Sequence, residues 1–215
     1  MSRLKLNHFA WVFGLLMGLI TTVNAQDSIK GKYELVQPPQ ATETPGKIEV
    51  VDVFWYGCPH CFRFLPSIEA YHKDKADYVE IRRLPAIFSK GWEMHARAYY
   101  TAKVLGVVDE LHVPIFEAIN EDGQKLSDKD SLRSFFVKHG VSGEDFDKTF
   151  ESFAVSTLMR KSLIMQSRYG VRGTPTVIIN GKYRTSGSLA GSYEEMIRVI
   201  KELAKRELAA GSIES

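Results

Sequence analysis

The sequence predicts an α/β fold that is interrupted by an inserted helical subdomain. Three observations support this prediction: an apolar strand that leads directly into a helix, a β-hairpin near the C-terminal end, and a long helical stretch between them. Strands and helices that alternate along a chain are typical of α/β domains. The 215 residues are enough for one sizeable core with an inserted subdomain.

The N-terminal segment, residues 1–25, has the features of a secretory signal peptide. Arg3 and Lys5 precede an apolar run of 12 residues at positions 9–20, and Val23 and Ala25 stand at positions −3 and −1 of a cleavage site. We expect cleavage after Ala25. An uncleaved membrane anchor is the weaker alternative, because a helix that spans a bilayer needs roughly 20 apolar residues.

The charge balance argues against a nucleic-acid partner. The whole chain has a formal net charge of +2, and removal of the two basic residues of the leader brings it to 0. Proteins that bind nucleic acids usually carry an excess of basic residues. After the leader, no apolar segment of the sequence is long enough to cross a membrane.

The first element after the leader is a strand that runs into a helix. Residues 47–57 form a nearly continuous apolar and β-branched run, which is typical of a central strand covered on both faces. Residues 58–75 predict a helix with Pro59 in its first turn, where a missing N–H is harmless. This arrangement places Cys58 at the helix N-terminus, and a second strand is expected at 78–84.

A long helical stretch follows. Two serines, Ser127 and Ser142, each with an aspartate three residues later, are candidate helix caps. We interpret the stretch as a compact helical insert, not a linker. The segments with apolar residues at helical spacing are 91–106, 107–123, 127–140 and 142–153.

The C-terminal part contains a hairpin and a final helix. Asn180 and Gly181 lie within the hairpin segment 176–187, and this pair suits a two-residue type I′ turn. Residues 192–210 predict an amphipathic helix. Its apolar stripe consists of Met196, Ile200 and Leu203.

The chemistry of the sequence is concentrated in Cys58 and Cys61, its only two cysteines. Residues i and i+3 of a helix lie about 5–6 Å apart, a separation that a disulfide can bridge. The helix terminus favours a thiolate at Cys58, and His60 can add a positive charge or a hydrogen-bond donor. We therefore expect Cys58 to be the attacking nucleophile and Cys61 the resolving thiol.

Three other roles for the cysteines are weaker. A structural disulfide would close a very small loop and constrain little of the unfolded chain. A metal site made of Cys58, His60 and Cys61 lacks a second cluster of ligands. Covalent c-type haem is excluded because Phe62 stands where a histidine is required. Thiol–disulfide exchange needs no metal or organic cofactor, and we expect none.

The motif CPHC after an aromatic-rich strand, together with the signal peptide, the helical insert and a later GTP, resembles the DsbA-type thiol:disulfide interchange proteins of the bacterial periplasm. The resemblance implies a thioredoxin-like fold with an inserted helical subdomain. Its two thioredoxin-like parts would be residues 26–88 and 161–215, with the insert at 89–160. A low thiol pKa and an oxidising couple are properties of that family and are carried over from it.

The same resemblance assigns further site residues. The family has a cis-proline loop beside the disulfide, which corresponds to Thr174-Pro175, and a substrate strand would pair with the Thr174 backbone. The family also has an acid six residues before the first cysteine, usually glutamate, and here Asp52 holds that position. Because Asp52 interrupts an otherwise apolar strand, it is either a buried, partnered acid that can shuttle protons or a residue at a misread edge position. Arg83 is either its partner or a solvated surface residue.

The resemblance implies a periplasmic dithiol oxidase that donates its disulfide to reduced, unfolded polypeptides. A quinone-linked membrane oxidase resembling DsbB would reoxidise it. The alternatives are a disulfide isomerase or reductase and, from a different class, a peptide-binding chaperone. Only about 20 residues separate the leader from the first strand, too few for the N-terminal dimerisation domain of isomerases, and we expect a monomer.

Overall fold

The computed structural model describes residues 28–211. The predicted signal peptide and its cleavage site after Ala25 lie outside these residues. Within the described part of the chain, no helix has both the length and the apolar character that a membrane span requires.

One five-stranded sheet forms the centre of the fold, with the strand order β1-β5-β4-β2-β3. β2 and β3 are parallel, and the other neighbouring pairs are antiparallel. Every residue of β2 after the first is buried, so the predicted central strand is confirmed. The strands are β1 (Glu34–Leu35), β2 (Ile48–Phe54), β3 (Val79–Pro85), β4 (Thr176–Ile179) and β5 (Tyr183–Ser186).

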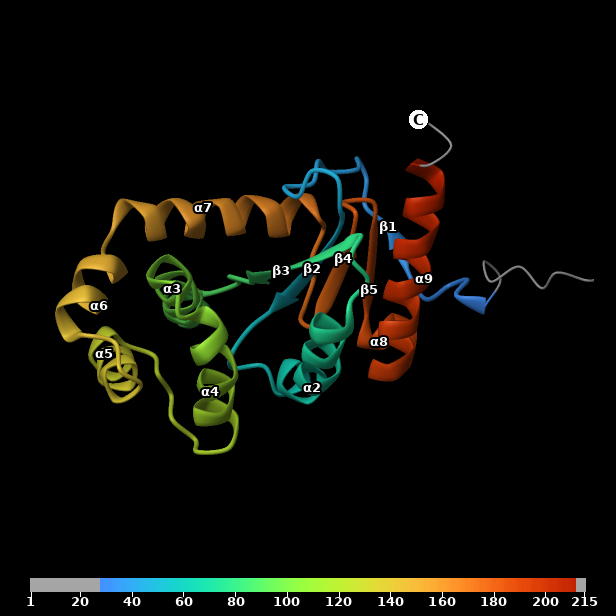
Figure 1. The fold of residues 1–215 in the computed structure, drawn as a ribbon. Coiled ribbons are helices and arrows are strands. Elements are labelled where there is room, and N and C mark those ends of the chain that lie inside the picture. The colour runs from blue at the N-terminus through green and yellow to red at the C-terminus, as the bar shows by residue number, and fades with distance from the viewer. Residues whose placement is uncertain (1–27, 212–215) are drawn as a thin grey trace, which may run out of the picture.

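Helices cover both faces of this sheet (Figure 1). Alternate residues of a strand point to opposite faces, and β2 has buried apolar residues on both. Val50 packs with α2 (Pro59–Asp74) and α9 (Tyr193–Gly211), and α8 (Gly187–Ala190) adjoins them. Val51 and Val53 pack against the other layer, α7 (Phe153–Arg168).

The helical insert lies beyond the carboxyl ends of β2 and β3 and has its own aromatic core (Figure 1). Phe116, Phe136 and Phe146 are buried in that core, which continues without a break to Phe54 and Cys58. The active-site end of the sheet therefore packs directly against the insert. Its helices are α3 (Lys90–Leu105), α4 (Val108–Asn120), α5 (Lys129–Lys138) and α6 (Gly143–Phe150).

The turn and cap predictions are confirmed with one exception. Asn180 and Gly181 have φ values of 50° and 64°, as the hairpin turn requires. Ser142 caps α6 by accepting the Asp145 N–H at 3.0 Å. The expected Ser127 cap is wrong: α5 begins one residue later, and Asp128 accepts the Ser131 N–H at 2.8 Å. A carboxylate at that position also interacts favourably with the positive end of the helix dipole.

Helix α7 was not expected from the sequence. Its N-terminus is marked by Ser152, whose hydroxyl accepts the Val155 N–H at 3.2 Å. The helix runs without interruption through residue 160, where the insert was expected to end. The division of the chain into two thioredoxin-like parts and an insert stays a prediction.

Candidate active site

Cys58 is the N-cap of α2, as predicted. The chain leaves β2, turns sharply, and the Cys58 N–H donates to the Trp55 carbonyl at 3.0 Å. A Cβ at position 57 would lie 2.4 Å from the Trp55 ring, so a larger residue than Gly57 would displace that ring. The Cys58 Sγ in turn accepts the Cys61 N–H at 3.3 Å, so the sulfur occupies the position of a helix-capping oxygen.

The two sulfurs have opposite electrostatic environments. Both cysteines are free thiols, with Cys58 7% exposed and Cys61 2% exposed. A hydrogen bond from the Cys61 thiol lowers the pKa of Cys58 to about 5, with help from Thr174 and the N–H groups of Cys61 and His60, against the effect of burial. Burial, and then the neighbouring Cys58 sulfur, raise the pKa of Cys61 far above its ordinary value. One sulfur is therefore a thiolate at neutral pH while the other remains a thiol.

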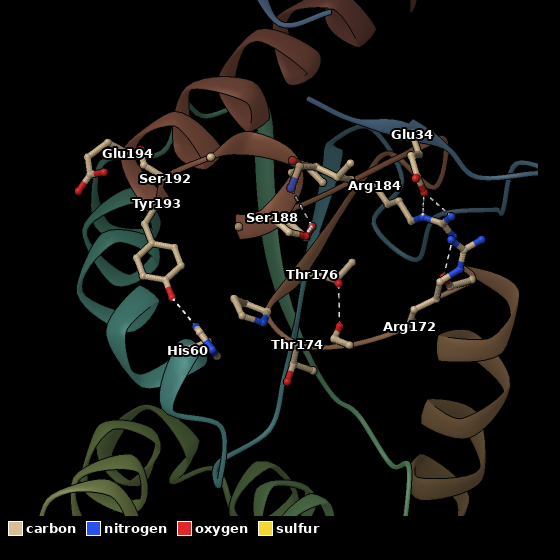
Figure 2. Close-up of a pocket in the computed structure, with 18 residues that line it drawn as sticks. Glu34, His60, Arg172, Thr174, Thr176, Arg184, Ser188, Ser192, Tyr193 and Glu194 are labelled. Carbon is tan, nitrogen blue, oxygen red and sulfur yellow. Dashed lines mark hydrogen bonds and ion pairs between the residues drawn. The ribbon is translucent and has the colours of Figure 1, made fainter. Parts of the chain in front are cut away.

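His60 acts on the Cys58 sulfur through its backbone. Its exposed imidazole Nδ1 lies 2.8 Å from the Arg63 Nη2 and 3.4 Å from the Tyr193 hydroxyl. Figure 2 shows the ring directed toward Tyr193. Pro59, the first residue of α2, has no N–H, and the amides available at this helix start are those of His60 and Cys61.

The Thr174-Pro175 bond is cis, as the resemblance implied. The Thr174 carbonyl oxygen lies 3.4 Å from the Cys58 Sγ, although the two residues are 116 positions apart. The fold thus brings the loop before β4 against the N-terminus of α2. Nothing in the local sequence indicates this contact.

Asp52 is buried under α2, on the same face of β2 as Val50 and Phe54. Burial raises its pKa to about 7; Arg83 opposes this effect and Glu69 adds to it. Its Oδ1 has no hydrogen-bond partner among the described residues.

Arg83 acts on Asp52 through its charge, while its hydrogen bonds go to other groups. The Arg83 guanidinium donates to Glu69 at 2.8 Å and to Asp109 at 3.2 Å. Arg83 lies on β3, an edge strand, and its long side chain extends from the sheet to carboxylates on α2 and α4. The shorter Asp52 side chain stays beneath α2.

Sequence reasoning missed the contacts by which α4 holds the turn before Cys58. The Tyr56 hydroxyl lies 3.0 Å from the His112 Nδ1, and the Asn120 side chain donates to the Tyr56 carbonyl at 2.9 Å. These partners are 56 and 64 residues apart, so no spacing rule could have found them.

A cavity of about 750 Å³ opens beside the cysteine pair, lined by His60, Thr174 and Pro175 and by the β5–α9 region. Figure 2 shows it between the cis-proline loop and the start of α9. Within residues 28–211, no three His, Cys, Asp or Glu side chains come together as a metal-ligand set.

Known proteins resemble this chain over nearly its whole length. A family model described as a DSBA-like thioredoxin domain matches residues 83–192. The thiol:disulfide interchange protein DsbA of Pseudomonas syringae pv. tomato is 40% identical over 203 residues, 94% of each chain. DsbA of Pseudomonas aeruginosa is 38% identical over 187 residues, 86% of this chain and 89% of the relative.

Solved structures agree with the sequence relatives. The crystal structure of Pseudomonas aeruginosa DsbA has a TM-score of 0.82 and 37% identity, covering 85% of this chain and 95% of that one. The oxidoreductase DsbA of Xylella fastidiosa has a TM-score of 0.78 and 33% identity, covering 83% and 96%. The predicted thioredoxin-like fold with a helical insertion is confirmed, and the chain belongs to the DsbA family of thiol:disulfide interchange proteins.

Proposed function

We propose that Cys58 and Cys61 are the redox-active pair through which this disulfide oxidoreductase of the DsbA family oxidises reduced, secreted proteins in the periplasm. The observation that carries the proposal is the environment of Cys58, whose pKa is lowered to about 5. A stabilised thiolate favours the reduced form of the pair, and the oxidised form is then a strong disulfide donor.

The exchange proceeds in two displacements. A substrate thiolate attacks the Cys58 sulfur, the Cys58–Cys61 bond breaks, and its electron pair goes to the Cys61 sulfur. A second substrate thiolate, and not Cys61, then attacks the substrate sulfur of the mixed disulfide, and Cys58 leaves as a thiolate. Attack by Cys61 on the mixed disulfide would only reverse the first displacement. Two electrons have passed to the cysteine pair, and the substrate holds the disulfide. The low pKa of Cys58, the leaving thiol, speeds the second displacement.

Asp52 supplies or removes the proton that Cys61 needs. Because burial raises the pKa of Cys61, the sulfur released in the first displacement must be protonated to remain stable. Asp52 lies under the same helix, and its pKa of about 7 suits proton exchange at neutral pH.

The other site residues shape the pair and receive the substrate. Pro59 and His60 define the start of α2 and the amides that face the thiolate. Thr174 and Pro175 form the edge beside Cys58 where an extended substrate strand pairs with the backbone.

The reduced protein must be reoxidised, and we assign this step to a quinone-linked membrane oxidase resembling DsbB. Export by a signal peptide cleaved after Ala25 supplies the periplasmic location, and the mature protein acts as a monomer. The reoxidising partner, the cleavage site and the monomeric state go beyond the family's known action on reduced proteins.

Oxidative refolding of a reduced model protein tests the proposal. The oxidised protein should form substrate disulfides in stoichiometric amounts, and Cys58→Ala should abolish the reaction. Cys61→Ala should also fail to oxidise the substrate, because a single thiol has no disulfide to donate. Suppression of aggregation by Cys58→Ala at the wild-type level, with no disulfide exchange by the wild type, would instead identify a chaperone. Efficient repair of scrambled disulfides with poor oxidation of dithiols would identify an isomerase.

A further inference from the structure

The cavity beside the cysteine pair has an asymmetric distribution of charge. Figure 2 shows Arg172, Arg184 and Glu34 on one side of it and His60, Tyr193 and Glu194 on the other. Because Thr174 and Pro175 also line the cavity, the part of a substrate that flanks a cysteine bound to Cys58 lies within reach of both sides.

On the first side, two arginines share one carboxylate. The Arg184 Nε donates to Glu34 at 2.8 Å, and its Nη1 donates to the carbonyls of Tyr169 at 3.1 Å and Gly170 at 2.6 Å. Hydrogen bonds and charge from Arg184, and the charge of Arg172, keep the pKa of Glu34 below its usual range. Two guanidinium groups beside one carboxylate leave a surplus positive charge on this side of the cavity, and Arg172 is the exposed member of the group.

On the opposite side of the cavity, the carboxylate of Glu194 is stabilised by hydrogen bonds at the start of α9. Hydrogen bonds at the start of α9, from the backbone of Glu194 and the side chain of Ser192, lower the pKa of Glu194. The Glu194 carboxylate therefore lies across the cavity from Arg172, Arg184 and Glu34 (Figure 2).

We propose that Arg172 selects reduced polypeptides that carry an acidic side chain close to the reacting cysteine, by forming an ion pair with that side chain. Arg172 lies two residues before Thr174, whose carbonyl contacts the Cys58 sulfur. On a substrate strand that pairs with the Thr174 backbone beside Cys58, a residue about two positions from the reacting cysteine therefore stands opposite Arg172. The inference rests on the proposed function and adds a preference among its substrates.

The test uses dithiol peptides with blocked termini that differ at one position, Glu, Gln or Lys, two residues from a cysteine. Oxidation of each peptide is followed by stopped-flow with wild type, Arg172→Gln and Arg172→Glu. Arg168→Glu is the matched control, since Arg168 is exposed at the end of α7 and does not line the cavity. Blocked termini separate a side-chain carboxylate from a terminal one.

Wild type should oxidise the Glu peptide about two- to five-fold faster than the Lys peptide, the range of an exposed ion pair. The preference should vanish in Arg172→Gln, reverse in Arg172→Glu, persist in Arg168→Glu, and shrink with salt. The Gln peptide should react at one rate with all variants, which shows that they are folded and active. Equal rates for the three peptides, or a preference that survives Arg172→Glu, would overturn the inference while leaving the oxidase function intact. Failure of wild type to oxidise any peptide would overturn both.

Discussion

Cys58 and Cys61 differ in reactivity because the fold places two identical side chains in different surroundings. Cys58 receives hydrogen bonds at the helix start, whereas Cys61, one turn later, is enclosed by apolar groups and faces the other sulfur. Their positions at i and i+3 keep the disulfide within reach. The spacing of the two cysteines was evident in the sequence. The assignment of Cys58 as the thiolate followed from its position at the helix N-terminus.

At the scale of the single thiol, alkylation should discriminate between the two cysteines. We expect iodoacetamide labelling of the reduced protein to occur at Cys58, with a midpoint near pH 5 in place of the ordinary value of about 8.5. Peptide mapping after labelling at a series of pH values measures this. Labelling of Cys61 first, or a midpoint near the ordinary value, would contradict the described environment.

Asp52→Asn should slow turnover and leave the alkylation midpoint of Cys58 nearly unchanged, because Asp52 is assigned to the proton of Cys61. Single-turnover oxidation measured beside alkylation separates these effects. Unchanged turnover would return Asp52 to a structural role.

The same variant makes a prediction about stability. The folded pKa of Asp52, about 7, lies above the unfolded value of about 3.9, so the folded state retains its proton longer. Wild-type stability is therefore lost as pH rises from about 4 to 7, by at most about 4 kcal/mol. Relative to wild type, Asp52→Asn should become progressively more stable over that interval in denaturant melts. Asp109→Asn, whose side chain is 80% exposed, is the control and should show little of this trend.

The junction between strand β2 and helix α2 depends on helix α4. The Asn120 side chain donates to the carbonyls of Tyr56 and Phe116, both buried residues. Asn120→Ala should destabilise the protein by about 1–3 kcal/mol, the effect of removing the side-chain donor from the carbonyl of the buried Tyr56. Denaturant melts measure it, with the exposed Gln124→Ala as control. A change no larger than that of the control would show that the turn does not need α4.

The sequence predicted elements whose signals are local. The β-branched run of β2, the Asn180-Gly181 turn and the stripe of α9 all follow from short-range patterns. Helix α7 was missed, although Ser152 marks its start. The ion pairs of Arg83 with Glu69 and Asp109 were missed because these carboxylates come near Arg83 only when the helices that carry them pack against the sheet.

At the scale of the whole molecule, the site is assembled from three distant parts of the chain. The cysteines come from the β2–α2 junction, the support of the preceding turn from α4, and the cis-proline loop from the segment before β4. Resemblance to a family supplied the role of Thr174-Pro175; no local pattern could have supplied it. The surplus positive charge beside Arg172 depends on the pairing of Arg184 with Glu34, which lies 150 positions away in the sequence.

If Cys58 and Cys61 form an oxidising pair, closing their disulfide must destabilise the protein at neutral pH and above. Closing a four-residue loop favours the oxidised form by about 2 kcal/mol. The ionised Cys58 thiolate has the opposite effect. The free energy of unfolding of the reduced form rises by about 1.4 kcal/mol for each pH unit above the folded pKa of Cys58, which is about 5. This rise ends near pH 8.5, where the thiol of the unfolded chain also ionises. This lowered pKa gives stability that is fully present above the unfolded value and lost as pH falls through the folded one.

Denaturant melts of the oxidised and reduced forms between pH 5 and 9 test this requirement most directly. The reduced form should be more stable by about 2 kcal/mol at pH 8, and the two forms should become equally stable at about pH 6.5. Below that pH the oxidised form should be the more stable one. An oxidised form that is more stable across the whole range, by an amount that does not change with pH, would mean an unperturbed Cys58 thiol and would contradict the assignment as a dithiol oxidase.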